Sequence, residues 1–506
     1  MISSSARPTL PPGAVRTVAD LARRLGTGIV GDPAAAGLAV TGIGDDSRTL
    51  AAGDAYVALP GEHRHGLDFE EQAAAAGAVV VVSDRPARTL PTLLTATPRA
   101  EVGPLAAWFH GSPSHRLSVL GVTGTNGKTS TAHFVDAGLT ATGASSGLIC
   151  GTCIRGPGLD VVPERTTPEA TTLQRTLAHF VREGVGACAM EVSSHAVVQH
   201  RVDGTRYHVM AFTNLGHDHL DYHGSMEQYF AAKAAMFTPD RTAAAAIDID
   251  DPYGARLAAT TRVATWTCSL RHPAADVYAD RIECDGAGSR FVVHSPSGDV
   301  AVALTTLGPH QVANAVVALT ALLADGRDVE AAAAGIAAMH GVPGRCEPVW
   351  AGQRYLALVD YMHNPHWQRA LLPYLRTLAS GRLILVLGAR GCRDHTKRAP
   401  LGRAAAEYAD LVVVTDDSPE DEDPAALRAA VLAGAHEVRD PHTRVVEIPD
   451  RRTAFDEAVT AAGPGDVVVV AGRGTDPVQR FGSRVVRFDD HAQLHGAIVA
   501  DRPRTR

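Results

Sequence analysis

The chain has 506 residues, of which 45% are hydrophobic and 20% are charged, and its formal net charge is −8. This composition can bury sizeable cores, so it excludes a mainly disordered protein, and a length of this size predicts about three or four domains. Because acidic residues outnumber basic ones, we expect no nucleic-acid partner.

Residues 1–15 lack the apolar centre of a signal peptide, and no apolar stretch reaches the roughly 18 residues that span a bilayer. We therefore expect a cytoplasmic protein without a membrane partner, and we take it to be a monomer. Seven cysteines, an odd number, argue against a disulfide framework.

The pair Cys150-Gly-Thr-Cys153 has the spacing of a redox pair or of half a zinc site. No second Cys pair or Cys/His pair follows at zinc spacing. We therefore interpret the pair as the continuation of a strand that begins near Gly147.

Two stretches that carry Gly and Pro, residues 111–115 and 341–345, divide the chain into three predicted domains. Residues 1–112 mix short strands and helices, and residues 113–347 open with a strand, a glycine turn and a helix. Residues 348–506 alternate strands with Ala-rich helices. The pattern predicts an α/β protein.

Residues 117–123 predict a buried strand, and a glycine loop and a helical stretch follow it. In this arrangement, backbone N–H groups and the helix dipole bind an anion. Lys128 would reach the β- and γ-phosphates of a nucleotide, and Thr129 would bind magnesium. Val122 replaces the first glycine of the strict motif, so the loop is a variant. The predicted nucleotide-binding residues are Gly124, Thr125, Asn126, Gly127, Lys128, Thr129 and Ser130.

Lysine is rare: only Lys128, Lys233 and Lys397 occur among 47 basic residues. A GC-rich genome would replace lysine by arginine wherever the site allows. The three remaining lysines therefore mark sites where arginine cannot do the same work, or they remain by chance. Lys233 lies in an apolar helical stretch, where a buried lysine is costly unless it is paired or modified. It is therefore either a snorkelling surface lysine or a carbamylated lysine that presents a carboxylate to a second magnesium ion.

Glu191 ends an apolar stretch that begins at Val185. A carboxylate at a strand end near a phosphate loop is a natural magnesium ligand, although an ordinary strand-terminal acid would look the same. Residues 214–224 hold three histidines and two aspartates without a common zinc spacing, which favours magnesium or substrate contacts.

The motifs GTNGKTS, TTPEA, EVSSH, DHLDYHG and YFAAKA occur in this order and resemble those of the Mur ligases. The resemblance covers nearly the whole chain and points to the type that adds the third amino acid to UDP-N-acetylmuramoyl-L-alanyl-D-glutamate. It implies a small α/β UDP-binding domain, a central P-loop ATPase-like domain with a parallel sheet, and a C-terminal Rossmann-like α/β domain that binds the amino acid. It also implies ATP, two Mg2+ sites and a carbamylated Lys233.

The resemblance also implies roles for single residues. Ser47 and the loop with Glu62, His63 and Arg64 would contact the uridine diphosphate. The muramoyl-dipeptide donor would be held by Thr166, Thr167, Ser193, Gln199 and Arg201. Arg165 stands where many relatives carry asparagine, a departure at the edge of the donor site.

For the nucleotide, the resemblance implies that Asn314 contacts adenine, that Asp360 contacts the nucleotide and that Arg345 reaches the γ-phosphate. Gln311 replaces the other asparagine of the adenine motif. The implied metal cluster is Thr129, Glu191, His219 and Lys233, and the implied catalytic residues are Lys128, Glu191, His219, Lys233 and Arg345.

In the third domain, residues 383–387, 411–414 and 467–471 predict parallel strands, whose following loops meet in one pocket. The family binds the incoming amino acid there. The candidate residues are Arg393, Asp417, Ser418, Glu420, Gly472 and Asp476. Lys397 lies in a segment that resembles the R-D-x-x-K-R of the family, without a clear role.

This pocket departs from the family, because diaminopimelate-adding members carry D-N-P-R where this chain has Asp417-Ser-Pro-Glu420. A glutamate in place of arginine would repel a distal carboxylate. We therefore predict that the acceptor is not meso-diaminopimelate. A basic amine such as lysine or ornithine would pair with Glu420, or Arg390 or Arg473 would neutralise it and the acceptor would be smaller or unusual.

The resulting hypothesis is an ATP-dependent ligase that joins an amino acid to a carboxylate of a UDP-muramoyl-dipeptide-like donor through an acyl phosphate. An alternative is a similar amide synthetase of a specialised-metabolite pathway, with a different donor and acceptor. A nucleotide-binding regulatory protein with a dead ligase site is a third hypothesis, against which the three retained lysines argue.

Overall fold

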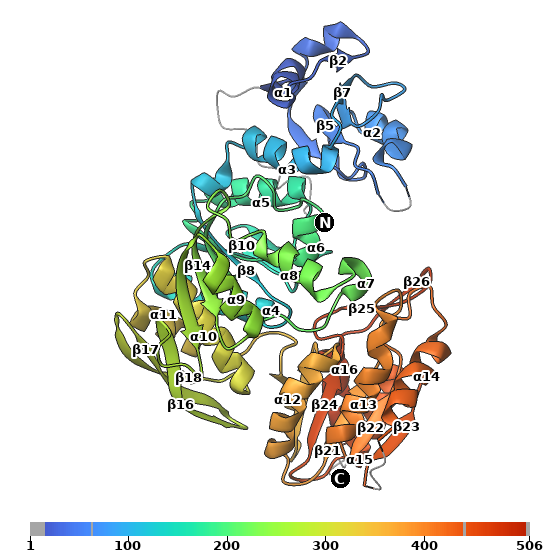
Figure 1. The fold of residues 1–506 in the computed structure, drawn as a ribbon. Helices are drawn as coiled ribbons and strands as arrows, with labels where there is room; N and C mark the ends of the chain where they lie inside the picture. The colour runs from blue at the N-terminus through green and yellow to red at the C-terminus, as the bar shows by residue number, and fades with distance from the viewer. Residues whose placement is uncertain (1–15, 62–63, 439–441, 502–506) are drawn as a thin grey trace.

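The computed structural model describes residues 16–61, 64–438 and 442–501. Its three large sheets follow one another along the molecule, from the blue N-terminal part through the green and yellow middle to the orange and red C-terminal part (Figure 1). In these ranges no helix is long and apolar enough to cross a membrane. Glu62 and His63 lie outside the described residues.

The first sheet has five strands in the order β2-β7-β6-β5-β4, and β4 to β7 run parallel. The central strands β5 and β6 are short and mostly apolar, and all their residues are buried. This composition suits a strand that is covered on both faces of the sheet. A separate pair, β1 and β3, lies beside it. The elements are β1 (Arg16–Thr17), α1 (Val18–Leu25), β2 (Ile29–Val30), β3 (Ala39–Val40), β4 (Gly42–Gly44), β5 (Asp54–Val57), α2 (Glu70–Ala75), β6 (Val80–Ser83), β7 (Thr92–Leu94) and α3 (Pro98–Phe109).

The second sheet has eleven strands in the order β11-β10-β9-β12-β8-β13-β14-β15-β16-β17-β18, and the seven from β9 to β16 are parallel. Strand β8 lies inside this parallel part, so the loop that follows it opens at the carboxyl edge of the sheet. Helices α4, α10 and α11 bury one face, and α5, α6, α8 and α9 bury the other. The predicted strand at 117–123 is confirmed, one residue shorter.

The elements of this middle part are β8 (Ser118–Thr123), α4 (Lys128–Ala141), β9 (Ser146–Ile149), β10 (Ile154–Gly156), β11 (Leu159–Val161), α5 (Ala170–Arg182), β12 (Ala187–Glu191), α6 (Ser194–Val198), β13 (Tyr207–Phe212), α7 (Leu220–His223), α8 (Met226–Ala234), β14 (Thr242–Asp248), α9 (Pro252–Thr260), β15 (Ala264–Ser269), β16 (Val277–Asp285), β17 (Gly288–Ser295), β18 (Gly298–Leu304), α10 (Pro309–Ala324) and α11 (Val329–Ala337).

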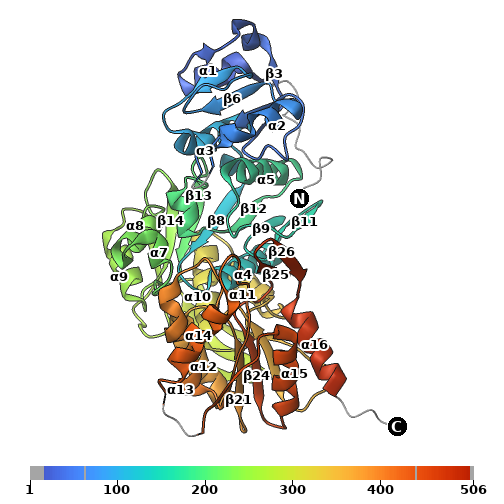
Figure 2. The same cartoon turned by 90° about the vertical axis from the view of Figure 1, so that its right-hand side faces the viewer.

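The third sheet has the order β19-β20-β24-β21-β22-β23 and is parallel from β20 onward. The three predicted strands occur residue for residue as β21 (Leu383–Leu387), β22 (Leu411–Val414) and β24 (Val467–Ala471). Helices α12, α13 and α14 cover one face and α15 and α16 the other (Figure 2). The other elements are β19 (Glu347–Pro348), β20 (Leu356–Asp360), α12 (Pro365–Leu378), α13 (Arg398–Tyr408), α14 (Pro424–Ala435), β23 (Arg444–Glu447), α15 (Arg451–Ala461), β25 (Val478–Phe481), β26 (Arg484–Arg487) and α16 (Asp490–Asp501).

The interpretation of Cys150 as part of a continuing strand is wrong. Strand β9 ends at Ile149 and β10 begins at Ile154, so residues 150–153 form the turn of an antiparallel hairpin. The turn is closed by the Cys150 N–H, which donates to the Cys153 carbonyl at 2.9 Å. A glycine and a threonine at its centre are compatible with such a turn.

Candidate active site

The loop between β8 and α4 wraps closely against its neighbours. Gly124 and Gly127 have positive φ angles of 149° and 85°, which favour glycine. A Cβ at Gly127 would lie 2.1 Å from the Asn314 side-chain oxygen, and one at Gly124 would lie 1.9 Å from the Thr213 hydroxyl. The backbone can therefore come close to Asn314 only with glycine at position 127.

Two of the three lysines meet at this loop. Lys128 Nζ donates to the Gly124 and Thr125 carbonyls at 3.0 and 2.7 Å, and Lys233 Nζ donates to the same Gly124 carbonyl at 2.7 Å. Lys233 is 1% exposed, which excludes a snorkelling surface lysine. Within the described ranges no ion pair joins Lys233 to a carboxylate, and burial together with nearby Lys128 holds its pKa well below the usual value.

Glu191 ends β12, the strand next to β8, and is 1% exposed. Its Oε1 accepts from the Gly151 N–H at 3.0 Å, and its backbone carbonyl accepts from the Thr167 hydroxyl at 2.9 Å. The Thr167 hydroxyl also accepts from the Ser193 N–H at 3.1 Å. The predicted acid and two predicted donor-binding residues therefore lie together.

His219 precedes α7 with a φ of 54°. Its ring centroid lies 4.7 Å from that of His195 and 6.3 Å from that of Tyr229, in edge-to-face contacts. Burial lowers the pKa of His219 to about 3, so the imidazole is neutral near pH 7. A neutral imidazole is the form that binds a metal ion.

Arg345 reaches the phosphate loop from the stretch just before β19. Its Nη2 donates to the Thr129 hydroxyl at 2.8 Å, and its guanidinium lies over the Tyr361 ring at 4.6 Å. Asp360 is buried and accepts from the Cys346 N–H at 2.7 Å and from the Trp367 indole N–H at 3.2 Å. Burial raises the pKa of Asp360.

Contacts between the middle and C-terminal parts gather around the same loop. Asn364 donates to the side-chain oxygens of Asn126 at 3.2 Å and of Asp218 at 3.3 Å. Lys397 Nζ lies 3.8 Å from Asp218 Oδ1, so the third lysine also faces this site. The His363 imidazole lies 3.5 Å from the same carboxylate.

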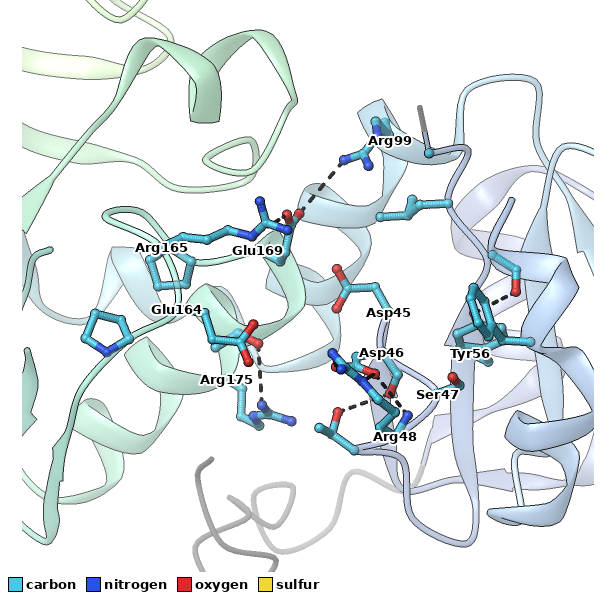
Figure 3. A pocket seen from close by; sticks show the side chains of 18 of the residues that line it. Asp45, Asp46, Ser47, Arg48, Tyr56, Arg99, Glu164, Arg165, Glu169 and Arg175 are labelled. Carbon is cyan, nitrogen blue, oxygen red and sulfur yellow. Dashed lines mark hydrogen bonds and ion pairs between the residues drawn. The ribbon is translucent and has the colours of Figure 1, made fainter. Parts of the chain in front are cut away.

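A pocket of about 590 Å³ lies between the N-terminal and middle parts of the chain. Asp45, Asp46, Ser47 and Arg48 point into it from one side, and Glu164, Arg165, Glu169 and Arg175 from the other (Figure 3). Ser47 is the predicted residue among them, and its hydroxyl donates to Gln72 Oε1 at 2.9 Å.

Glu169 links this pocket to the predicted donor residues. Its carboxylate pairs with Arg201 at 3.1 Å, Arg165 at 3.5 Å and Arg99 at 3.9 Å. Arg201 in turn donates to Gln199. The Arg165 that departs from the family therefore forms an ion pair at the pocket wall.

The loops after β21, β22 and β24 meet as the parallel-sheet argument predicts. Arg390 donates to Glu420 at 2.7 and 3.1 Å and to Asp476 at 3.1 Å, so each loop contributes one member of this cluster. Arg473 is 1% exposed and instead contacts Asp490 at 3.3 Å and the Ser418 hydroxyl at 3.0 Å. Of the two open alternatives for a partner of Glu420, Arg390 is the observed one.

Two further acceptor candidates differ in their surroundings. Asp417 is 4% exposed and lies 3.6 Å from Arg473, next to Gly472 at the strand end. Arg393 is exposed and donates to the carbonyl of Cys392, so it is not part of the Arg390 cluster. Sequence reasoning missed Glu164, Glu169 and Arg175 in the pocket of Figure 3 and assigned no role to Asp218. The one sequence signal for Asp218 was the concentration of histidines and aspartates in residues 214–224.

Three family models match the chain: the Mur ligase family catalytic domain at residues 39–102, the Mur ligase middle domain at 122–322, and the Mur ligase glutamate ligase domain at 344–474. The UDP-N-acetylmuramoyl-L-alanyl-D-glutamate–2,6-diaminopimelate ligase of Streptomyces avermitilis is 46% identical over 468 residues, which cover 91% of this chain and 92% of that protein. The UDP-N-acetylmuramyl-tripeptide synthetase of Leifsonia xyli subsp. xyli is 39% identical over 506 residues, 97% of each chain.

A solved structure of a UDP-N-acetylmuramoyl-L-alanyl-D-glutamate–2,6-diaminopimelate ligase matches with a TM-score of 0.63 and 29% identity, covering 91% of this chain and 95% of that one. The match extends through all three sheets, and the ordered motifs of the sequence lie around one phosphate loop. The chain therefore belongs to the Mur ligase family and is an ATP-dependent ligase that forms amide bonds.

Proposed function

We propose that this protein joins an amino acid to the free carboxylate of a UDP-N-acetylmuramoyl-dipeptide through an acyl phosphate, and that its acceptor carries a cationic rather than an anionic distal group. The observation that supports the acceptor proposal is that Arg390 forms ion pairs with both Glu420 and Asp476. The Streptomyces relative is named as a ligase of UDP-N-acetylmuramoyl-L-alanyl-D-glutamate, and this name supports the proposed class of donor.

On the donor side, the pocket of about 590 Å³ has a size typical of sites for small molecules and cofactors. Arginines line both walls, among them Arg48, Arg99 and Arg165, and each would exchange its ion pair with Asp46 or Glu169 for phosphate oxygens. This supports binding of a UDP-linked sugar there, with Thr167, Ser193 and Arg201 toward the phosphate loop.

For magnesium, the donor set consists mainly of oxygen atoms, which this hard cation prefers. Thr129 supplies a hydroxyl and Glu191 a buried carboxylate, and His219 adds a ring nitrogen. Bound Mg2+ would neutralise charge on the phosphates.

A carbamate on Lys233 would form when its neutral amine attacks CO2, making an N–C bond and releasing one proton. The burial of Lys233 and the carbonyl partner it has in place of a carboxylate support this modification. Labelled bicarbonate should give a carbamate carbon signal that is absent from Lys233→Arg, and removal of CO2 should lower activity reversibly. Equal activity with and without CO2 would contradict it.

The donor carboxylate attacks the γ-phosphorus of ATP, the bond to the β-phosphate oxygen breaks, and ADP leaves. Lys128 and Arg345 hold positive charge beside the transferring group, where electrostatic stabilisation lowers the barrier. The acceptor amine then attacks the acyl carbon, phosphate leaves, and the amine loses a proton. Contacts from Asn364 and Lys397 support closure of the C-terminal domain over the phosphate loop during both steps.

On the acceptor side, Arg390 neutralises Glu420, which on the sequence argument alone would favour a smaller acceptor. Asp476 is a second carboxylate on the same guanidinium, so the three side chains together carry one net negative charge. An arginine that two carboxylates already engage is a poor ligand for a third, whereas the cluster attracts an ammonium group. This supports lysine or ornithine as the acceptor class, although the Streptomyces relative is named for diaminopimelate. No observation favours the specialised-metabolite alternative.

The test is phosphate release with ATP, Mg2+ and UDP-N-acetylmuramoyl-L-alanyl-D-glutamate against a panel of lysine, ornithine, meso-diaminopimelate, alanine and glutamate. We expect the highest kcat/KM with a basic diamino acid. A highest value with meso-diaminopimelate would overturn the acceptor proposal alone. If no acceptor gives phosphate release, although the protein still binds ATP, the donor proposal would be overturned.

A further inference from the structure

The hairpin turn between β9 and β10 brings together two thiols that the ligase reaction does not use. Cys150 Sγ and Cys153 Sγ lie 3.8 Å apart across the turn. Cys150 is fully buried, and Cys153 is half-buried on the same turn. The pair therefore has one protected and one accessible sulfur atom.

A third ligand atom arrives from α4, upstream in the sequence. His133 Nε2 lies 3.7 Å from Cys150 Sγ and 3.0 Å from the Thr152 hydroxyl. His133, Cys150 and Cys153 hold their ligand atoms within 4.8 Å of one another. In the described part of the chain, no other group of three or more His, Cys, Asp or Glu residues meets this criterion.

Two of the three separations match the edges of a tetrahedral metal site. With a Zn–S distance of about 2.3 Å and a Zn–N distance of about 2.0 Å, a tetrahedron has S–S edges of about 3.8 Å and S–N edges of about 3.5 Å. The observed values are 3.8 Å for the two sulfur atoms and 3.7 Å for nitrogen to Cys150 sulfur. The third edge, from His133 Nε2 to Cys153 Sγ, is no longer than 4.8 Å, so it would shorten by at most about 1.3 Å when an ion binds.

We propose that His133, Cys150 and Cys153 form a binding site for a thiophilic divalent transition-metal ion of the Zn2+ class. Each thiol loses a proton to solvent as its metal–sulfur bond forms, so binding releases two protons and needs no oxidant. Two thiolates balance the charge of the ion, and a neutral complex can lie in a mostly buried place. Water or the Thr152 hydroxyl takes the fourth position.

The histidine distinguishes this proposal from a simple disulfide. A disulfide would join Cys150 and Cys153 alone and would have to shorten their separation to about 2 Å with the help of an oxidant. A buried imidazole 3.7 Å from Cys150 Sγ is not part of that bond but is a preferred ligand for zinc.

The site lies next to the ligase centre. Gly151, inside the turn, donates its N–H to Glu191 at 3.0 Å, and a Cβ at this position would lie 3.4 Å from the Thr166 hydroxyl. An ion across residues 150 and 153 would fix this turn and hence the Glu191 contact. This consequence rests on the proposed role of Glu191, whereas metal binding itself does not.

The experiment titrates the reduced, chelator-treated full chain with Co2+ and records thiolate-to-cobalt charge-transfer absorption, and then displaces Co2+ with Zn2+. We expect one bound Co2+ or Zn2+ per chain by native mass spectrometry when excess Mg2+ occupies the proposed magnesium site. Cys150→Ser/Cys153→Ser should abolish the absorption band, and His133→Gln should keep both thiols but weaken the affinity by at least about 100-fold. Cys392→Ser, a change at an exposed cysteine elsewhere, should bind as the unchanged chain does.

Circular dichroism establishes that each variant is folded, and His133→Gln provides a second route if the double variant is not. Absence of the charge-transfer band in the unchanged chain would overturn the proposal. The same holds if the band persists at full strength in both the double variant and His133→Gln. Loss of two hydrogen atoms without metal uptake would identify a disulfide pair instead and would also overturn it.

Discussion

At the scale of single residues, Glu420 is the side chain that would set the charge of the proposed acceptor pocket. It binds Arg390 through its carboxylate and adopts a left-handed backbone with a φ of 54°. Glu420→Arg would place a second cation beside Arg390 and leave Asp476 to pair with one of them. The site would then attract a distal carboxylate in place of an ammonium group.

We expect Glu420→Arg to raise the ratio of kcat/KM for meso-diaminopimelate over that for lysine by at least about tenfold, equivalent to about 1.4 kcal/mol. Phosphate-release assays with both acceptors measure the ratio. Glu437→Arg is the matched control, because Glu437 pairs with Arg403 on an exposed surface. An unchanged ratio in Glu420→Arg would show that the Arg390 cluster does not select the acceptor.

Glu420 also shows which side-chain contacts cannot be predicted from the sequence. That Glu420 departs from the family could be read from the sequence, but its partner could not. Arg390 is 30 residues away and joins Glu420 only because β21 and β22 are neighbours in the sheet. His133 likewise joins the cysteines only through the packing of α4 on β9. Contacts between side chains on different elements depend on the tertiary structure.

At the scale of elements, the first turn of α4 depends on Gly127. An alanine there would adopt a positive φ, at a cost of about 1–2 kcal/mol, and would also displace Asn314. We expect Gly127→Ala to lower the free energy of unfolding by more than this cost and to weaken ATP binding by more than about tenfold.

Gly143 provides the matched control, because it follows α4 with a φ of 82° and a Cβ added to it would meet no atom of the described chain within 4 Å beyond its two neighbouring residues. Gly143→Ala should show only the cost of the left-handed backbone and unchanged ATP binding. Urea unfolding and nucleotide titration measure both variants. Equal effects of the two substitutions would contradict a role for the close approach to Asn314.

Helix α2 is tied to the segment before β7 by a buried carboxylate. Glu70 is 5% exposed and accepts from the N–H groups of Arg88, Thr89 and Leu90 at 2.6–3.1 Å. Burial alone would raise its pKa, but these hydrogen bonds outweigh it and lower the pKa below the usual value. The stabilisation is therefore present above about pH 4.3 and is lost as the pH falls through the folded-state pKa.

We expect Glu70→Gln to lower the free energy of unfolding by about 1–3 kcal/mol at pH 7, because the amide presents donors to other donors. The difference from the unchanged chain should shrink as the pH falls below 4.3, roughly the ordinary pKa of glutamate. Glu71→Gln, at an exposed neighbouring position, should have little effect at any pH. A pH-independent difference for Glu70→Gln would contradict the role of the ionised carboxylate.

Comparison of the helices and strands with the sequence shows which parts of the fold can be predicted from it. The strands at 383–387, 411–414 and 467–471 were predicted residue for residue because each is a short, wholly apolar run that ends at polar residues. The three-stranded antiparallel meander of β16, β17 and β18 is not predicted by the sequence analysis, because its strands are half-exposed and mix polar with apolar residues. The turn at Cys150 was misread because the apolar run continues past the strand end.

At the scale of the whole molecule, the middle and C-terminal parts meet through Asp218. Lys397, His363 and Asn364 all approach its buried carboxylate, and Asn364 also reaches Asn126 of the phosphate loop. This arrangement brings Lys397, which has no role derived from the sequence, close to the glycine loop between β8 and α4. If both steps of the reaction need this arrangement, Asp218 and Lys397 should act as a unit.

A double-mutant cycle tests this coupling. Asp218→Asn and Lys397→Met should each lower kcat/KM, and the double variant should lower it by less than the product of the two factors. We expect a coupling of about 0.5–3 kcal/mol in the transition-state free energy. Arg403→Met is the control, because Arg403 pairs with Glu437 inside the C-terminal part and should not couple to Asp218. Strictly multiplicative effects of Asp218→Asn and Lys397→Met would mean that the contact does not contribute to the reacting state.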